Sequence, residues 1–405
     1  MYAAETLPGG ALDGDRLARR NALVLAVAQA LGGANTIIVV TTGGIVGAML
    51  APDKGLATLP ITVMVLGMWA GTLPLGALAR RFGRRIALQI GSALGVLAGL
   101  IDYLAVMRGG FALFLAGAFC AGLYAAAVQS YRFAAADTAS AKFRAKAVSW
   151  VLTGGIAAAV IGPQLIIVTK DLLPPFLFAA SYLGQAGLAL LAAGILTAVR
   201  MPAPPPKGAG GGRPLGEIVA TPRFITAAAC GAVSYAMMNL VMTSAPLAML
   251  ACDHSVTDAT LGLQWHVLSM FLPSFFTGSL INRFGVERVA VSGLMLICAA
   301  AGVALTGTSL VHFWTLLVLL GLGWNLAFIG ATTMVTQCHR PEERNKVQAF
   351  NDFLVFGGMA LGSFSSGQLL AVSGWAAVNE VVIPATIAAA ALLLWRQLRD
   401  HRAAA

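Results

Sequence analysis

The sequence predicts an all-α integral membrane protein with twelve transmembrane helices in two pseudo-symmetric six-helix halves. Composition is the first observation behind this prediction. Of the 405 residues, 58% are hydrophobic and only 10% are charged, and the mean hydropathy is +0.82. Because a soluble domain carries about 25% charged residues, this chain lacks the polar residues needed to cover a surface in water. The other two observations are a series of long apolar stretches and an internal repeat.

Twelve apolar stretches are each long enough to cross a membrane. A helix of about 20 residues spans the ~30 Å of bilayer hydrocarbon. The predicted spans are residues 21–48, 56–79, 86–107, 111–133, 147–169, 175–199, 224–250, 259–281, 289–309, 312–336, 347–371 and 376–395. The first span follows Arg16, Arg19 and Arg20 but shows no small-residue cleavage site. We therefore expect it to be a retained span and not a signal peptide.

The basic turn after the second predicted span returns after the eighth. Four of its residues recur 202 positions later: Gly76, Arg81, Phe82 and Gly83 correspond to Gly278, Arg283, Phe284 and Gly285. A second pair, Arg144 and Lys146, corresponds to Arg344 and Lys346, 200 positions later. Repeats that keep the same order indicate a duplicated bundle, a construction common among secondary transporters.

The distribution of basic residues predicts how the chain is threaded through the membrane. With the N-terminus inside, every Lys and Arg except Lys54, Arg108 and Lys170 falls on cytoplasmic segments. This asymmetry is the one that the positive-inside rule describes, so both termini are expected in the cytoplasm. The net charge of +10 is then a topology signal, and no nucleic acid is expected as a partner. We expect a monomer in the lipid bilayer of the bacterial inner membrane.

A Pro/Gly-rich segment divides the predicted spans into two groups of six. Proline and glycine break helices, and the segment has no hydrophobic periodicity, so we interpret it as a linker. The expected organisation is a cytoplasmic N-terminal tail 1–20, an N-terminal six-helix bundle 21–199, a cytoplasmic linker 200–222, a C-terminal six-helix bundle 223–396 and a cytoplasmic tail 397–405. The remaining loops are short, so the chemistry is expected to take place inside the membrane.

The two basic turns resemble the signature of the major facilitator superfamily, Gly-x-x-x-Asp-(Arg/Lys)-x-Gly-x-(Arg/Lys)-(Arg/Lys). The matching residues are Gly76, Arg81, Gly83, Arg84 and Arg85 in the first copy, and Gly278, Asn282, Arg283, Gly285 and Arg288 in the second. Arg80 stands where the family usually has Asp, so either Asp137 takes over the ion pair or the gate at this turn is looser. Arg132, at the inner end of the fourth span, is expected to belong to the same cytoplasmic gate.

The resemblance extends over nearly the whole chain and implies alternating access by two rocking halves. It also implies that the first, fourth, seventh and tenth helices line a central cavity. Polar groups inside the membrane are costly and mark candidate sites, and those near mid-membrane are Asn35, Tyr124, Gln185, Asn239, Trp324 and Asn325. The alternative for each is an ordinary hydrogen bond between helices, worth at most about 1–2 kcal/mol.

Two titratable residues are candidates for proton coupling. His266 lies about 18 Å from the turn at Gly278 and is the only histidine well inside a predicted span. Imidazole titrates near physiological pH, so a proton bound there could be exchanged during transport. Asp102 is the second candidate. The alternatives are a neutral, hydrogen-bonded core histidine and an ion pair between Asp102 and Arg108.

These features predict a secondary active transporter of a small molecule, most simply proton-coupled efflux of an amphipathic compound. A weak match to an exporter motif, Gly162-Pro163 in the fifth span, slightly favours export. Uptake of a nutrient such as a vitamin or organic acid remains open, as does a non-transporting membrane sensor. We expect no enzyme, no cofactor and no metal site, because there is no His-Glu-x-x-His motif and no His or Cys cluster. ATP is not expected to drive the process, because no phosphate-binding loop is present.

Overall fold

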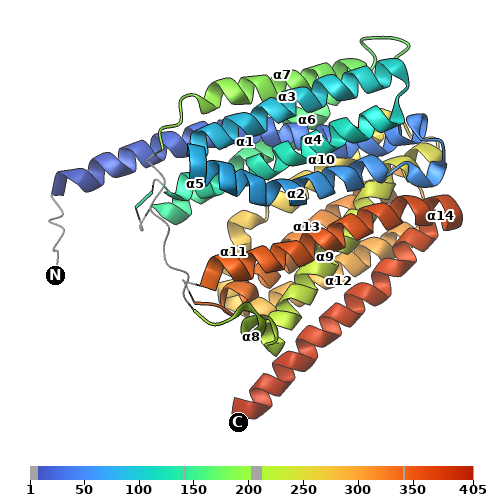
Figure 1. Ribbon diagram of the computed structural model, residues 1–405. Coiled ribbons are helices and arrows are strands. Elements are labelled where there is room, and N and C mark those ends of the chain that lie inside the picture. The colour runs from blue at the N-terminus through green and yellow to red at the C-terminus, as the bar shows by residue number, and fades with distance from the viewer. Residues whose placement is uncertain (1–7, 138, 141–142, 202–211, 341–342, 405) are drawn as a thin grey trace. The chain divides into compact units, whose positions relative to one another are not determined.

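The computed structural model describes residues 8–137, 139–140, 143–201, 212–340 and 343–404. Every regular element in this part of the chain is a helix, as predicted from the sequence (Figure 1). The bilayer explains this uniformity, since hydrocarbon offers no partner to backbone N–H and C=O groups and a helix satisfies them within itself.

The elements follow one another in chain order with short connections. From the N-terminus they are α1 (Pro8–Leu50), the 3₁₀ turn η1 (Lys54–Leu56), α2 (Leu59–Phe82), α3 (Arg84–Arg108), α4 (Phe111–Gln129), α5 (Tyr131–Asp137), α6 (Arg144–Thr169) and α7 (Ala179–Leu196). After the linker come α8 (Leu215–Val219), α9 (Pro222–Ala251), α10 (Val256–Phe271), α11 (Ser274–Phe284), α12 (Val286–Thr306), α13 (Leu310–Thr336) and α14 (Arg344–Ala404). Part of the predicted linker, residues 202–211, lies outside the described residues.

The helices account for all twelve predicted spans. Ten described segments are long and apolar enough to cross a membrane. The predicted eighth span is not among them because it is broken into α10 and α11, of 16 and 11 residues. The last segment, Lys346–Arg399, contains two spans, since α14 bends at Gly374, where φ is 78°. Figure 1 shows the two arms of α14 meeting at this bend.

The chain divides into two compact units, each with its own core. The first unit comprises Met1–Val39 and Leu66–Pro206, and the second comprises Val40–Val65 and Lys207–Ala405. The division differs from the predicted bundles in one segment, Val40–Val65, which packs with the second unit through η1 and α14. The predicted boundaries of tails, bundles and linker stay a prediction, although α1 already begins at Pro8, inside the expected N-terminal tail.

The repeated basic turns have the same backbone conformation. Gly83 joins α2 to α3 with φ 86° and ψ 154°, and Gly285 joins α11 to α12 with φ 90° and ψ 150°. This region of backbone space is open almost only to glycine. No heavy atom lies within 4 Å of the place that a Cβ would take at either position. The constraint on these two residues is therefore the backbone conformation and not crowding by neighbours.

Substituting either glycine should destabilise the protein through backbone strain alone. We expect Gly83→Ala and Gly285→Ala each to lower the free energy of unfolding by about 1–3 kcal/mol. The measurement is thermal or denaturant unfolding of the purified protein in detergent. Gly302→Ala is the matched control, because Gly302 is an open position inside α12 with an ordinary φ. An equal loss of stability in the control would contradict this explanation.

Candidate functional site

Three of the predicted polar residues come together in the first unit. The Asn35 side chain on α1 donates a hydrogen bond to the Gln185 backbone oxygen on α7, over 3.1 Å. The Gln185 side chain interacts with the carboxyl group of Asp102 on α3. Asp102 is fully buried, and neither carboxyl oxygen has a hydrogen bond of standard geometry. Within the described residues no ion pair joins it to Arg108. A carboxyl group is thus buried in the first unit with no cationic partner among the residues that the structure describes.

Tyr124 lies apart from this group, in the core of the first unit. Its ring is fully buried and packs so closely on Gly95 of α3 that no side chain could replace that glycine without movement. Its hydroxyl group lies near those of Tyr131 and Ser92. In this structure Tyr124 therefore contributes to helix packing.

Asn325 holds together the broken eighth span. Pro273 has no backbone N–H, and the helix stops at Phe271 and restarts at Ser274, which leaves carbonyl groups of the last turn of α10 without helical partners. The Asn325 side chain donates to the Met270 oxygen over 2.6 Å and to the Ser274 hydroxyl over 2.7 Å. The Thr277 hydroxyl donates to Asn325 Oδ1 over 2.6 Å. All three hydrogen bonds described for the Asn325 amide are thus made with residues that flank the break.

His266 and Asn239 are also tied to neighbouring helices. Nδ1 of His266 lies 2.8 Å from the Leu317 oxygen, so this nitrogen carries the proton and donates. Its Nε2 is buried with no hydrogen-bond partner among the described residues. Asn239 donates to the Met359 oxygen on α14 over 3.0 Å and does not contact His266 through this amide. Both side chains therefore join two spans of the second unit.

An aromatic cluster, which the sequence did not single out, surrounds Trp324. Trp324 and Phe328 are four residues apart on α13, so they share one helix face, and their rings stack at 5.0 Å with an interplanar angle of 12°. Tyr235 of α9 meets both rings nearly at right angles, at a centroid distance of 5.1 Å from each. We call Tyr235, Trp324 and Phe328 the aromatic cluster. The four-residue spacing was the only sequence signal for Phe328.

The basic turns have matching contacts in the two repeats. The guanidinium of Arg81 lies 5.2 Å from the ring centroid of Phe82, and that of Arg283 lies 5.3 Å from Phe284. Arg84 forms an ion pair with Asp137, with 2.5 Å between Nε and Oδ2. Of the two alternatives that the sequence left open, the structure therefore has the one in which Asp137 forms an ion pair at this turn. Its partner is Arg84. The pair joins the start of α3 to the end of α5.

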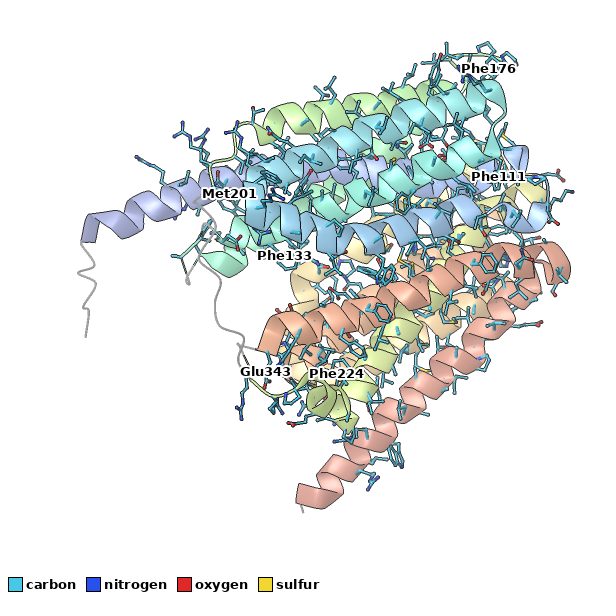
Figure 2. The ribbon with its side chains drawn as sticks, viewed as in Figure 1. Phe111, Phe133, Phe176, Met201, Phe224 and Glu343 are labelled. Carbon is cyan, nitrogen blue, oxygen red and sulfur yellow. The ribbon has the colours of Figure 1, made fainter. Side chains whose placement is uncertain are left out.

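An ion pair with a buried carboxylate holds the described end of the linker against the second unit. Arg213 donates from Nε and Nη2 to the two carboxyl oxygens of Glu343 over 2.9 and 2.8 Å, and its backbone N–H adds a third bond of 2.8 Å. The Glu343 side chain is inaccessible to solvent, and it lies near α8 at the same end of the unit as Phe224 (Figure 2). The Arg213 guanidinium holds the pKa of the Glu343 carboxyl well below its usual range. This carboxyl is therefore charged throughout the physiological range.

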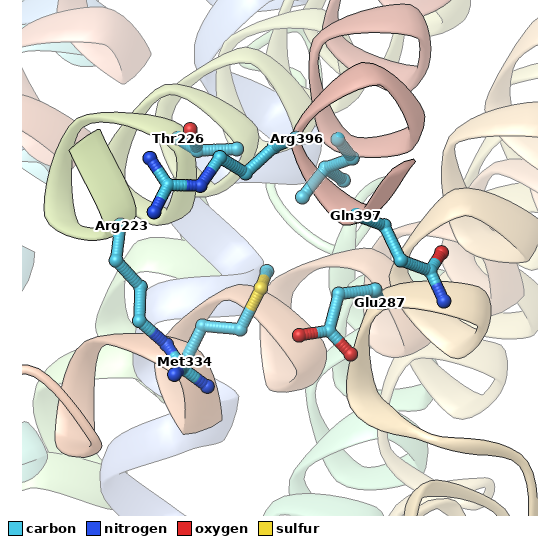
Figure 3. A pocket seen from close by; sticks show the side chains of 7 residues that line it. Arg223, Thr226, Glu287, Met334, Arg396 and Gln397 are labelled. Carbon is cyan, nitrogen blue, oxygen red and sulfur yellow. The ribbon is translucent and has the colours of Figure 1, made fainter. Parts of the chain in front are cut away.

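A small pocket lies at the same end of the second unit, between the ends of α9, α12, α13 and α14 (Figure 3). It is lined by Arg223, Thr226, Glu287, Met334, Leu393, Arg396 and Gln397. It contains none of the residues predicted to line the substrate cavity, and its charged groups lie at helix ends. We do not assign the substrate site to it. Within the described chain, no three His, Cys, Asp or Glu side chains gather closely enough to hold a metal ion.

The loop between the first two spans is hydrogen-bonded to α14. This contact lies at one end of the second unit, and the linker lies at the other end. The Thr58 hydroxyl donates to the Ser363 oxygen over 3.0 Å, and the Gln368 amide donates to the Gly55 oxygen over 3.1 Å. Gly367 lies between these two bonds, and a Cβ there would overlap the Thr58 hydroxyl. We call this contact the far-end clasp. It joins segments more than 300 positions apart, which no local sequence pattern could reveal.

The chain is similar to known transporters over nearly its whole length. It is 50% identical over 370 residues to the riboflavin transporter RfnT of Brucella anthropi, and the alignment covers 91% of this chain and 93% of that one. It is 29% identical to YdeG of Bacillus subtilis, an uncharacterized MFS-type transporter, with 90% and 89% of the two chains covered. The sequence profile of the Major Facilitator Superfamily matches residues 227–405.

Solved transporter structures share the fold at much lower sequence identity. The xylose transporter XylE from E. coli superposes with a TM-score of 0.71 at 13% identity, covering 94% of this chain and 98% of that one. The nucleoside transporter NupG gives a TM-score of 0.71 at 14% identity, with 93% and 99% covered. At such identities the likeness shows a shared fold and says nothing of the substrate.

The far-end clasp yields a prediction that needs no knowledge of the substrate. Gly367→Ala should loosen it, because the added methyl group cannot fit beside the Thr58 hydroxyl. We expect faster hydrogen exchange of the backbone amides around residues 54–58, measured by mass spectrometry on the purified protein. Gly357→Ala is the matched control on the same helix, where a Cβ meets nothing within 4 Å. Unchanged exchange in Gly367→Ala would show that the clasp tolerates the methyl group.

Proposed function

Since the chain belongs to the major facilitator superfamily of membrane transporters, we propose that it takes up riboflavin, or a closely related planar vitamin, across the bacterial inner membrane. The observation that carries this proposal is the 50% identity to a riboflavin transporter along 91% of the chain. Two proteins that share half of their residues over 370 aligned positions are expected to share many of the residues that contact a substrate.

The proposal changes the preferred direction of transport. The sequence alone favoured efflux of an amphipathic compound, with uptake of a vitamin as the alternative. The similarity to RfnT supports the vitamin alternative, whereas export is supported only by the Gly162-Pro163 element in α6. Because riboflavin is a planar ring system with a polar side chain, uptake of this compound also agrees with spans that combine aromatic and amide side chains.

Transport is proposed to proceed by alternating access of two halves, with both termini in the cytoplasm and the protein acting as a monomer. The distribution of Lys and Arg supports this orientation. Proton coupling is part of the proposal, and Asp102 and His266 are its two candidates. We favour Asp102, because both its carboxyl oxygens lack hydrogen bonds of standard geometry, whereas one nitrogen of His266 is already bonded to the backbone. Through Gln185 and Asn35, Asp102 is also connected to α1.

Growth of a riboflavin auxotroph tests the substrate directly. In a bacterial strain that neither makes riboflavin nor imports it, expression of this chain should restore growth on low external riboflavin. Uptake of radiolabelled riboflavin should rise above that of cells carrying the empty vector, because the added protein supplies the only route of entry. Membrane-located protein without growth or uptake would refute the proposal, and lowered cellular riboflavin would indicate export.

The pH profile of uptake tests the coupling group. If Asp102 carries the proton, Asp102→Asn should flatten the dependence of uptake on external pH while exchange of labelled for unlabelled substrate continues, since an amide cannot exchange a proton. His266→Asn is the comparison, because its amide nitrogen can keep the bond to the Leu317 oxygen. A flat profile in that variant alone would transfer the role to His266. Wild-type profiles in both variants would exclude both residues.

A further inference from the structure

We propose that the aromatic cluster of Tyr235, Trp324 and Phe328 is the surface on which the ring system of a planar heteroaromatic substrate stacks. In this assignment the indole N–H of Trp324 donates a hydrogen bond to an acceptor on the edge of the ring. The inference rests on the proposed function, and it adds to it a specific site and the chemistry that the site recognises.

The geometry of the cluster suits a flat ligand. The rings of Trp324 and Phe328 lie within 12° of parallel at a centroid distance of 5.0 Å and thus form a two-ring stack on α13. Tyr235 stands at 89° and 83° to these two rings, beside the stack. The end of the stack offers a face for offset stacking, and Tyr235 offers an edge-to-face contact, the two arrangements that aromatic rings prefer.

The cluster also holds a polar group that lacks a partner. Trp324 is 7% exposed, and within the described residues its indole nitrogen has no hydrogen-bond acceptor. A buried donor without an acceptor is unfavourable, and tryptophan N–H groups in protein interiors normally have one. A ligand carbonyl or ring nitrogen would satisfy this donor, and flavin-like rings carry both kinds of acceptor along one edge.

Two of the three rings are partly exposed. Trp324 belongs to the buried core of the second unit, whereas Tyr235 and Phe328 pack against that core and are only partly buried. The two partly exposed rings thus lie beside Trp324, which carries the unpartnered donor. The three side chains carry no positive charge, so they suit a neutral ring better than a sugar acid.

Ordinary helix packing would produce the same three contacts without any ligand, so a comparison within the protein is needed. A second tryptophan in the same unit provides it. Trp375 contacts Phe313 at 5.3 Å, and its indole nitrogen also lacks a partner within the described residues. It lies beside the bend at Gly374, outside the aromatic cluster. Effects of Trp324 that Trp375 does not share cannot be ascribed to the loss of a buried indole in general.

The experiment measures binding of riboflavin to the purified full-length protein in detergent. Equilibrium dialysis with radiolabelled riboflavin gives the dissociation constant, and quenching of flavin fluorescence reports stacking on an aromatic ring. We expect Trp324→Phe to weaken binding about fivefold to tenfold with quenching retained, because a two-ring stack remains and the donor is lost. Phe328→Ala should weaken binding at least about tenfold and reduce quenching, because one ring of the stack is gone.

Trp375→Phe is the control variant, and it should bind riboflavin as the wild type does. Unfolding temperatures measured on every variant separate loss of the site from loss of the fold. Wild-type binding in Trp324→Phe and Phe328→Ala would overturn the assignment and leave riboflavin uptake standing. If the wild type binds no riboflavin, the proposed function fails. In that case the same binding assay is repeated with lumichrome and other planar heteroaromatic compounds, and failure to bind any of them overturns the site as well.

Discussion

The structure depends on one constraint, that backbone polar groups inside hydrocarbon must be satisfied by the protein itself. Unbroken helices meet this constraint without help from side chains. The eighth span does not, because it stops at Phe271 and restarts at Ser274. The Asn325 amide on the neighbouring α13 supplies the missing partner to Met270, and in this way the broken span keeps a fixed place against α13.

The same constraint determines what most of the other buried amides do. Asn35 and Asn239 each give a side-chain N–H to a backbone carbonyl of a different helix, and His266 does so through Nδ1. These carbonyls can accept a second bond, so such contacts tie spans together without breaking a helix. Most polar residues deep in a span thus stabilise the packing of the helices. The candidates for binding a substrate or a proton are the groups whose hydrogen bonds are incomplete, above all Asp102 and Trp324.

Much of this fold could be predicted from the sequence, because the hydrocarbon thickness sets the length of a span and the repeat locates the two turns at Gly83 and Gly285. The break in the eighth span could not be predicted, since Pro273 is also compatible with a kinked but continuous helix. The site was less predictable for a different reason. Depth in the membrane identifies a residue such as Asn325 as polar and central, but only packing decides whether its bonds go to the backbone. Tyr235 could not be singled out from the sequence, because its contacts are with two aromatic rings on another helix.

The far-end clasp consists of neutral donors and backbone oxygens, from Thr58 to Ser363 and from Gln368 to Gly55. Ionic strength weakens contacts between charges and has little effect on hydrogen bonds of this kind. The contact of residues 55–58 with α14 is therefore expected to keep its strength as the salt concentration of the surrounding solution changes.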